Sequence, residues 1–199
     1  MEVRRTVPVK LDVADSDADL LHETISEFLW AANYVVDHAW QDEYKTTSKA
    51  ELQRETYDDV RAETRLQANL VQNARNKAAE AVKGVVARWK HGDYAGKPNF
   101  SAPTLVYDKR CATFNDDHAT LSTVEGRITA EYVLPDESRE TPHSEYLFND
   151  DYEVTGAELH YRDGEFYLHV RTKADVESET ADDGNDEHST VLGVDLGIE

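Results

Sequence analysis

Residues 154–173 read VTGAELHYRDGEFYLHVRTK, and this stretch gives the clearest indication of the fold. Asp163-Gly164 is a dipeptide typical of a tight two-residue hairpin turn, and apolar and polar residues alternate on both sides of it. One face carries Ala157, Leu159, Tyr161, Phe166, Leu168 and Val170, and the other carries Glu158, His160, Arg162, Glu165, Tyr167, His169 and Arg171. The pattern predicts strands over 154–162 and 165–173, with one buried face and one solvated face.

Further strands are predicted on both sides of the helices. Short β-like runs cover residues 104–107, 112–114, 119–122 and 127–134, and Asp and Gly turns separate them. Residues 135–151 are expected to form an exposed loop. Residues 3–13 alternate between apolar and polar side chains, and Pro8 within this stretch favours an edge strand or a bulge.

Between the first strand and the later ones, apolar residues recur at helical spacing. Asp15, Ser16 and Asp17 are candidates to cap a helix that continues to about residue 40. The sequence Ser48-Lys-Ala-Glu51 is a capping box that predicts the start of a second helix. A third helix is expected from about residue 64 to His91-Gly92. These patterns predict a helical bundle inserted after one strand.

The chain of 199 residues carries 41 acidic and 21 basic side chains, for a formal net charge of −20. Self-repulsion of this size is largely screened in molar salt, so the composition favours a salt-rich cytoplasm. The single cysteine, Cys111, excludes an intrachain disulfide and is expected to pack in the core. No apolar stretch is long enough for a membrane span, and no signal peptide is evident, so we expect a soluble cytoplasmic protein without membrane partners.

The basic residues are concentrated in one segment. Residues 61–100 contain eight Lys and Arg but only three Asp and Glu. Together with Asn69, Asn73, Asn76, Trp89 and Tyr94, they suit phosphate contacts and base stacking. The predicted nucleic-acid contacts are Arg75, Lys77, Lys83, Arg88 and Lys90, with Arg4 and Arg5 extending the surface. The alternative is a solvated helix face that pairs with acids elsewhere in the chain. Because high salt weakens counterion release, a structured RNA is favoured over bare DNA.

Two further groups of residues could hold a metal ion. His160 and His169 share the solvated hairpin face with Glu158, but the absence of a third convergent ligand favours polar strand residues without a metal. Residues 174–190 are acidic and predict a solvated linker, after which VLGVDLGI at 191–198 predicts a buried strand presenting Asp195. Such an Asp could bind Mg²⁺ on the first strand of a ribonuclease-H-like domain, belong to an actin-like phosphate loop, or be a structural buried acid.

Several stretches, in this order, resemble the TnpB family, the OrfB-type transposase-associated proteins of insertion sequences, which are related to type V CRISPR effectors. The similar stretches are residues 28–34, 55–61, 66–86, 108–114, 126–128, the Asp163-Gly164 hairpin and residues 191–198. The resemblance covers nearly the whole chain, and the acidic composition is similar to that of haloarchaeal members.

The resemblance implies an α+β fold. An oligonucleotide-binding-like β-barrel, called the wedge, would be interrupted by a helical bundle and followed by a truncated ribonuclease-H-like (RuvC) domain. The implied divisions are a first wedge strand at 1–14, a helical recognition domain at 15–94, the wedge barrel at 95–173, an acidic linker at 174–189 and the start of RuvC at 190–199.

The implied function is the RNA- and DNA-binding part of a transposon-encoded, RNA-guided DNA endonuclease, with guide RNA and target DNA as partners. Asp195 matches the first catalytic acid and Mg²⁺ ligand of the family. The remaining acids and the zinc ribbon do not occur in these 199 residues, so this chain is expected to bind nucleic acid without cutting it. The alternatives are a non-catalytic regulator left from a disrupted transposon gene and the front half of an actin-like ATPase. No oligomeric state follows from the sequence.

Overall fold

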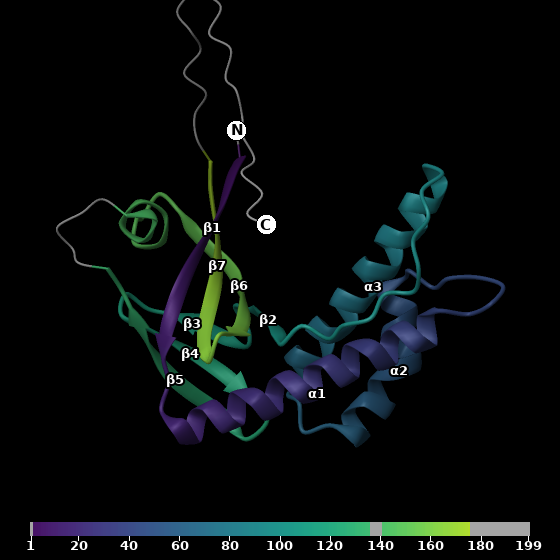
Figure 1. The fold of residues 1–199 in the computed structure, drawn as a ribbon, viewed down its shortest axis with the longest axis horizontal. Helices are drawn as coiled ribbons and strands as arrows, with labels where there is room; N and C mark the ends of the chain where they lie inside the picture. The colour runs from purple at the N-terminus through teal and green to yellow at the C-terminus, as the bar shows by residue number, and fades with distance from the viewer. Residues whose placement is uncertain (1, 136–140, 176–199) are drawn as a thin grey trace, which may run out of the picture.

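Seven antiparallel strands form one strongly curved, nearly closed sheet, and three helices extend from it (Figure 1). This computed structural model describes residues 2–135 and 141–175. The strands are β1 (Glu2–Asp12), β2 (Thr104–Asp108), β3 (Ala112–Phe114), β4 (His118–Thr123), β5 (Gly126–Val133), β6 (Glu153–Arg162) and β7 (Glu165–Asp175). Their order in the sheet is β2-β6-β7-β1-β5-β4-β3. The protein is therefore α+β, with a barrel-like sheet interrupted after its first strand by helices.

The two edge strands of the sheet, β2 and β3, lie at the seam of the barrel. The hydroxyl of Tyr107 on β2 donates a 2.9 Å hydrogen bond to the carbonyl of Ser122 on β4, and Tyr107 is completely buried. Cys111, in the turn between β2 and β3, is also buried, which confirms that it packs in the core. Burial raises the pKa of its thiol to about 11. This seam is closed by side-chain packing and hydrogen bonds.

The β6–β7 hairpin is confirmed. Arg162 pairs with Glu165, and Asp163 and Gly164 have φ of 54° and 83°, the left-handed conformation that a type I′ turn requires. The predicted inward face is buried except at its rim, since only Tyr161 remains partly exposed. Leu159, Leu168 and Val170 join Val7 and Val9 of β1 inside the barrel.

The helices are α1 (Asp15–Ala39), α2 (Lys49–Glu63) and α3 (Ala68–Lys90). Helix α1 begins beside the barrel and runs out to pack against α2 and α3 (Figure 1). The hydroxyl of Thr24 on α1 accepts a 3.1 Å hydrogen bond from the backbone N–H of Val124, in the β4–β5 turn. This buried contact fixes the bundle to the barrel.

The helix ends agree with the sequence in part. Ser48 caps α2 as predicted, accepting a 3.3 Å hydrogen bond from the Glu51 N–H. At α1, however, the residue before the first turn is Ala14, which makes no side-chain cap; Asp15 and Asp17 lie inside the first turn. Helix α3 begins at Ala68 rather than near residue 64; the backbone is still extended at Gln67, and Leu66 is fully buried in the connection from α2.

Two expectations for the barrel hold only in part. Strand β1 is central in the sheet, between β7 and β5, although at Pro8 only β7 is its strand partner in the described sheet. There, the ring of His143 lies 2.9 Å from the carbonyl of Pro8. His143 belongs to a short π-helix, η1 (His143–Leu147), so the described part of the predicted loop is partly ordered against β1. Tyr146 and Leu147 supply the apolar contacts for this packing.

Candidate nucleic-acid interface

The distal half of α3 extends beyond the rest of the bundle (Figure 1). Lys83, Arg88 and Lys90 are exposed, and within the described residues none of the three forms an ion pair. No acid occurs between residues 81 and 92. Lys83 and Lys90 lie seven residues, or about 10 Å, apart on one helix face. This end of α3, residues 81–92, forms a cationic arm on an acidic protein.

Aromatic residues stabilise the turn that follows this helix. The indole N–H of Trp89 donates a 2.8 Å hydrogen bond to the carbonyl of Ala95, and the ring meets Trp40 edge-on at 5.4 Å. These contacts hold the turn against α3, while Tyr94 within it is 91% exposed. Tyr94 is therefore available for stacking, whereas the indole N–H of Trp89 is engaged in holding the turn.

The chain leaves this turn and returns along α3. Ala95 lies against Trp89, and Phe100 lies beneath the ammonium group of Lys77, which is 5.7 Å from the ring centre. Asn33 on α1 both donates to and accepts from the backbone of Phe100, at 2.9 and 2.8 Å. The returning segment is thus fixed between α1 and α3.

Arg75 and Lys77, from the proximal half of α3, face the interior of the molecule. The Arg75 guanidinium donates to Gln53 at 2.5 Å and to Asn76 at 2.8 Å, and its Nε is buried without a partner in the described residues. Burial, assisted by the charge of Arg110, lowers the pKa of Arg75. Lys77 pairs with Glu158 of β6. The structure gives both side chains partners within the chain.

Two of the predicted asparagines also have internal partners. Asn73 is buried and donates to the carbonyl of Val106 on β2 at 3.1 Å, and Asn76 accepts from Arg75. Asn73 therefore joins α3 to the barrel.

Arg4 and Arg5 lie on β1 and point to opposite faces of the sheet, as neighbours in a strand do. Arg4 is exposed and pairs with Glu2 at 2.7 Å. Arg5 lies over the ring of Tyr146 in η1, with its guanidinium carbon 5.5 Å from the ring centre. Both are exposed, but they lie on the barrel and not on the bundle.

The outer face of β6 and β7 carries basic side chains that the sequence analysis assigned only to the solvated face of the hairpin. Arg162 lies 4.7 Å from the ring centre of Tyr167, and the exposed Arg171 forms no ion pair within the described residues. Nearby cations on this face are balanced, because Lys10 pairs with Glu165 and Lys173 pairs with Glu153. The alternation of apolar and polar residues in the hairpin is the sequence pattern that indicates that Arg162 and Arg171 lie on the outer face.

A histidine pair lies in the middle of this face. The rings of His160 and His169 stack at 4.1 Å with an angle of 22°, and Glu158 lies 3.7 Å from His160. Burial, and then the neighbouring His160 and Arg162, lower the pKa of His169. Within the described residues, no group of three or more His, Cys, Asp or Glu side chains could hold a metal ion.

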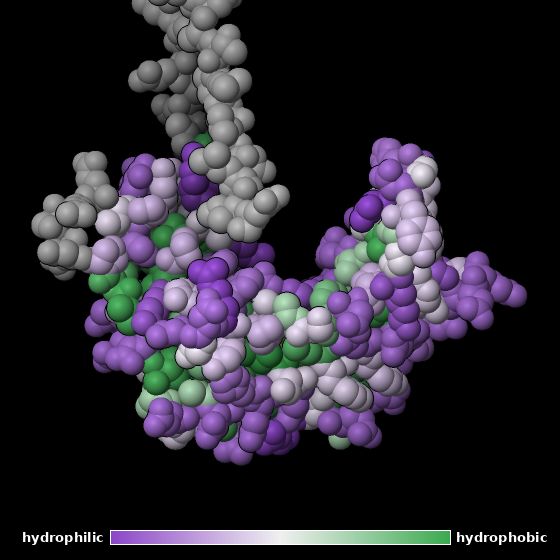
Figure 2. Space-filling model, viewed as in Figure 1, coloured by the Kyte–Doolittle hydropathy of each residue, from purple (hydrophilic) through white to green (hydrophobic). Residues whose placement is uncertain are grey.

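The surface is hollowed between the barrel and the distal half of α3, and the projecting end of the helix is strongly hydrophilic (Figure 2). The ion pair between Lys77 of α3 and Glu158 of β6 joins the helix to the barrel. The arrangement places unpaired cations and an exposed aromatic ring on one arm beside a barrel.

Asp195, the predicted acidic linker and the predicted final strand lie outside the described residues. Among the described helices, none combines the length and apolar character needed to cross a membrane. No protein-family model matches the sequence, and no curated protein is similar enough to count as a relative.

Proposed function

We propose that this chain is the nucleic-acid-binding part of a TnpB-type, transposon-encoded, RNA-guided DNA nuclease. One observation carries the binding function. Lys83, Arg88 and Lys90 stay exposed and free of ion pairs within the described residues, although the chain has twenty more acidic than basic side chains. If the acidic surface served only solubility, we would expect these cations to be paired with acidic side chains or replaced by other residues. Contacts with a phosphate backbone require cations that have no partner within the chain.

The order of the elements supports the more specific assignment. A strand, three helices and then six strands that complete a barrel correspond to the wedge and recognition plan implied by the TnpB resemblance. The barrel has seven strands, and the oligonucleotide-binding fold has five, so the proposed wedge is a related, enlarged barrel. Asp195 is proposed as a Mg²⁺ ligand; the binding proposal does not depend on it.

The proposed ligand is a structured RNA. Three cations give limited electrostatic attraction once salt is high, so base stacking must add to the affinity. Tyr94 provides an exposed ring at the end of the cationic arm, which suits the unpaired bases of an RNA loop.

The test is RNA retention by the 199-residue chain purified in about 0.3 M KCl, where contacts between cations and phosphates still contribute to the affinity. We expect the wild-type chain to retain RNA that ribonuclease removes and deoxyribonuclease does not. The variant Lys83→Ala/Arg88→Ala/Lys90→Ala should retain at least tenfold less.

The control removes three exposed cations elsewhere, as Lys49→Ala/Arg54→Ala/Arg127→Ala on α2 and β5; these side chains already have partners within the chain, as in the Lys49–Glu80 and Arg54–Glu55 ion pairs. This variant carries the same charge change and should retain RNA as the wild type does. Equal loss in both variants, or a wild-type chain free of RNA, would contradict the proposal.

A further inference from the structure

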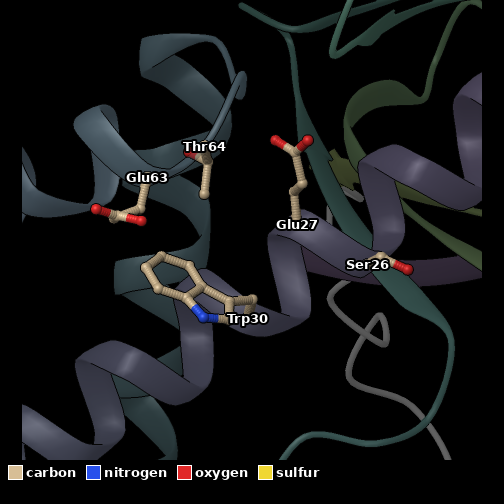
Figure 3. Close-up of a pocket in the computed structure, with 5 residues that line it drawn as sticks. All are labelled: Ser26, Glu27, Trp30, Glu63 and Thr64. Atoms are coloured by element: carbon tan, nitrogen blue, oxygen red, sulfur yellow. The ribbon is translucent and has the colours of Figure 1, made fainter.

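A shallow pocket of about 300 Å³ lies between α1 and the end of α2 (Figure 3). Ser26, Glu27 and Trp30 of α1 line one side, and Glu63 and Thr64 at the end of α2 line the other. None of these residues belongs to the cationic arm or to the outer barrel face. The pocket is thus a separate feature of the bundle.

Trp30 forms the apolar wall of this pocket and is held in place. Its ring stacks on Tyr34 at 5.3 Å with an angle of 19°, and the Tyr34 hydroxyl donates a 2.8 Å hydrogen bond to Asp59 on α2. Even so, Trp30 remains 42% exposed. A large aromatic ring has been left accessible at a fixed orientation, on a helix whose other aromatic and aliphatic residues are mostly buried.

Carboxylates flank the ring on both sides (Figure 3). Glu27 accepts hydrogen bonds from the backbone N–H and the Nε of Arg65, at 2.7 and 2.8 Å. Arg65 also pairs with Glu23 and Glu125, and it is not one of the residues that line the pocket. Glu63 forms no ion pair or hydrogen bond within the described residues. The pocket therefore repels phosphates and attracts cations.

We propose that this pocket binds an arginine side chain of a partner protein. A guanidinium is planar and weakly hydrated, so it can stack on the indole face and at the same time donate hydrogen bonds to carboxylates beside it. A hydrated potassium ion gains little from an aromatic ring, and a lysine ammonium is compact and cannot match both acceptors in one plane. Arg65 already makes this kind of contact within the chain, because its guanidinium pairs with the carboxylate of Glu27 on the pocket wall.

The proposal is independent of nucleic-acid binding and is tested with small probes. The full chain, labelled with ¹⁵N, is titrated with N-acetyl-arginine amide while the three tryptophan indole N–H signals are followed by NMR. The Trp30 signal is assigned with Trp30→Phe. We expect saturable movement of the Trp30 signal only. N-acetyl-citrulline amide, which has the same shape without the charge, and N-acetyl-lysine amide should each bind at least threefold more weakly.

Two charge variants of α2 separate the pocket from general acidity. Glu63→Gln should weaken arginine binding at least threefold, whereas Asp58→Asn, an exposed carboxylate on the same helix, should leave it unchanged. Equal binding of the citrulline or lysine probe would overturn the proposal, as would equal effects of the two variants or a Trp30 signal that does not move.

Discussion

The ammonium group of Lys77 on α3 lies 2.5 Å from a carboxylate oxygen of Glu158 on β6, and this pair joins the helical bundle to the barrel. Both side chains are mostly buried, with 22% and 33% exposed. Burial alone would raise the pKa of Glu158, but the Lys77 hydrogen bond and charge bring it below its usual value.

Replacing Lys77 with Met should lower the free energy of unfolding by about 1–3 kcal/mol, because the Glu158 carboxylate stays partly buried without its partner. Urea denaturation followed by circular dichroism measures the change. Lys83→Met removes an exposed cation from the same helix and should change stability by less than about 0.5 kcal/mol. Equal effects of the two variants would show that the pair does not stabilise the junction.

Tyr94→Ala should weaken binding of a labelled hairpin RNA by roughly 1–3 kcal/mol, the usual contribution of one stacked base. Its stability should not change, since the side chain is 91% exposed. Fluorescence anisotropy measures the affinity, and Tyr94→Phe, which keeps the ring, should bind as the wild type does. If Tyr94→Phe lost as much affinity as Tyr94→Ala, the hydroxyl and not stacking would be responsible.

Gly156 lies at the bulge in β6, with φ of +153°. A Cβ atom there would lie 2.7 Å from the Tyr107 carbonyl oxygen, so Gly156→Ala should destabilise the protein by about 1–3 kcal/mol. Gly84→Ala is the control, because this position in α3 has open space around it and Ala favours helix by up to about 1 kcal/mol. Thermal unfolding should shift in opposite directions for the two variants; a shift in the same direction would contradict the bulge geometry.

Acidification should destabilise the protein partly through His169. Its pKa in the folded state lies below the ordinary value of 6.5, owing first to burial and then to His160 and Arg162. The unfolded chain therefore takes up this proton first as the pH falls below about 6.5, and stability is lost until the folded-state pKa is passed. His169→Gln should lose less stability than the wild type between pH 7.5 and the folded-state pKa. Parallel pH profiles of the two proteins would exclude this contribution.

The hairpin could be predicted from sequence because Asp163-Gly164 and the alternation on both sides specify a turn and a register locally. The Ser48 cap and the helical stripes are local signals of the same kind. The place of β1 in the sheet is not local. It depends on pairing with β5 and β7, more than 100 residues later, and Pro8 is accommodated where β1 has one strand partner.

The candidate interface, too, could be predicted only in part, because it depends on how the helix packs as well as on its own sequence. Charge counts identified α3, but they cannot distinguish a cation that faces solvent from one that faces the barrel. Arg75 and Lys77 have partners on α2 and β6, which only the packing of the helix reveals. Likewise, the sequence of α1 places Glu27 near Trp30, but only the packing of α2 against α1 brings Glu63 to the other side of the exposed ring.

The most direct test of the proposed function is the salt dependence of hairpin RNA binding. Each lost phosphate contact reduces the slope of log affinity against log salt concentration by about 0.7–0.9. The variant Lys83→Ala/Arg88→Ala/Lys90→Ala should therefore have a slope smaller by about 2, while Lys49→Ala/Arg54→Ala/Arg127→Ala keeps the wild-type slope. Identical slopes for wild type and both variants would show that the exposed end of α3 does not contact the RNA backbone.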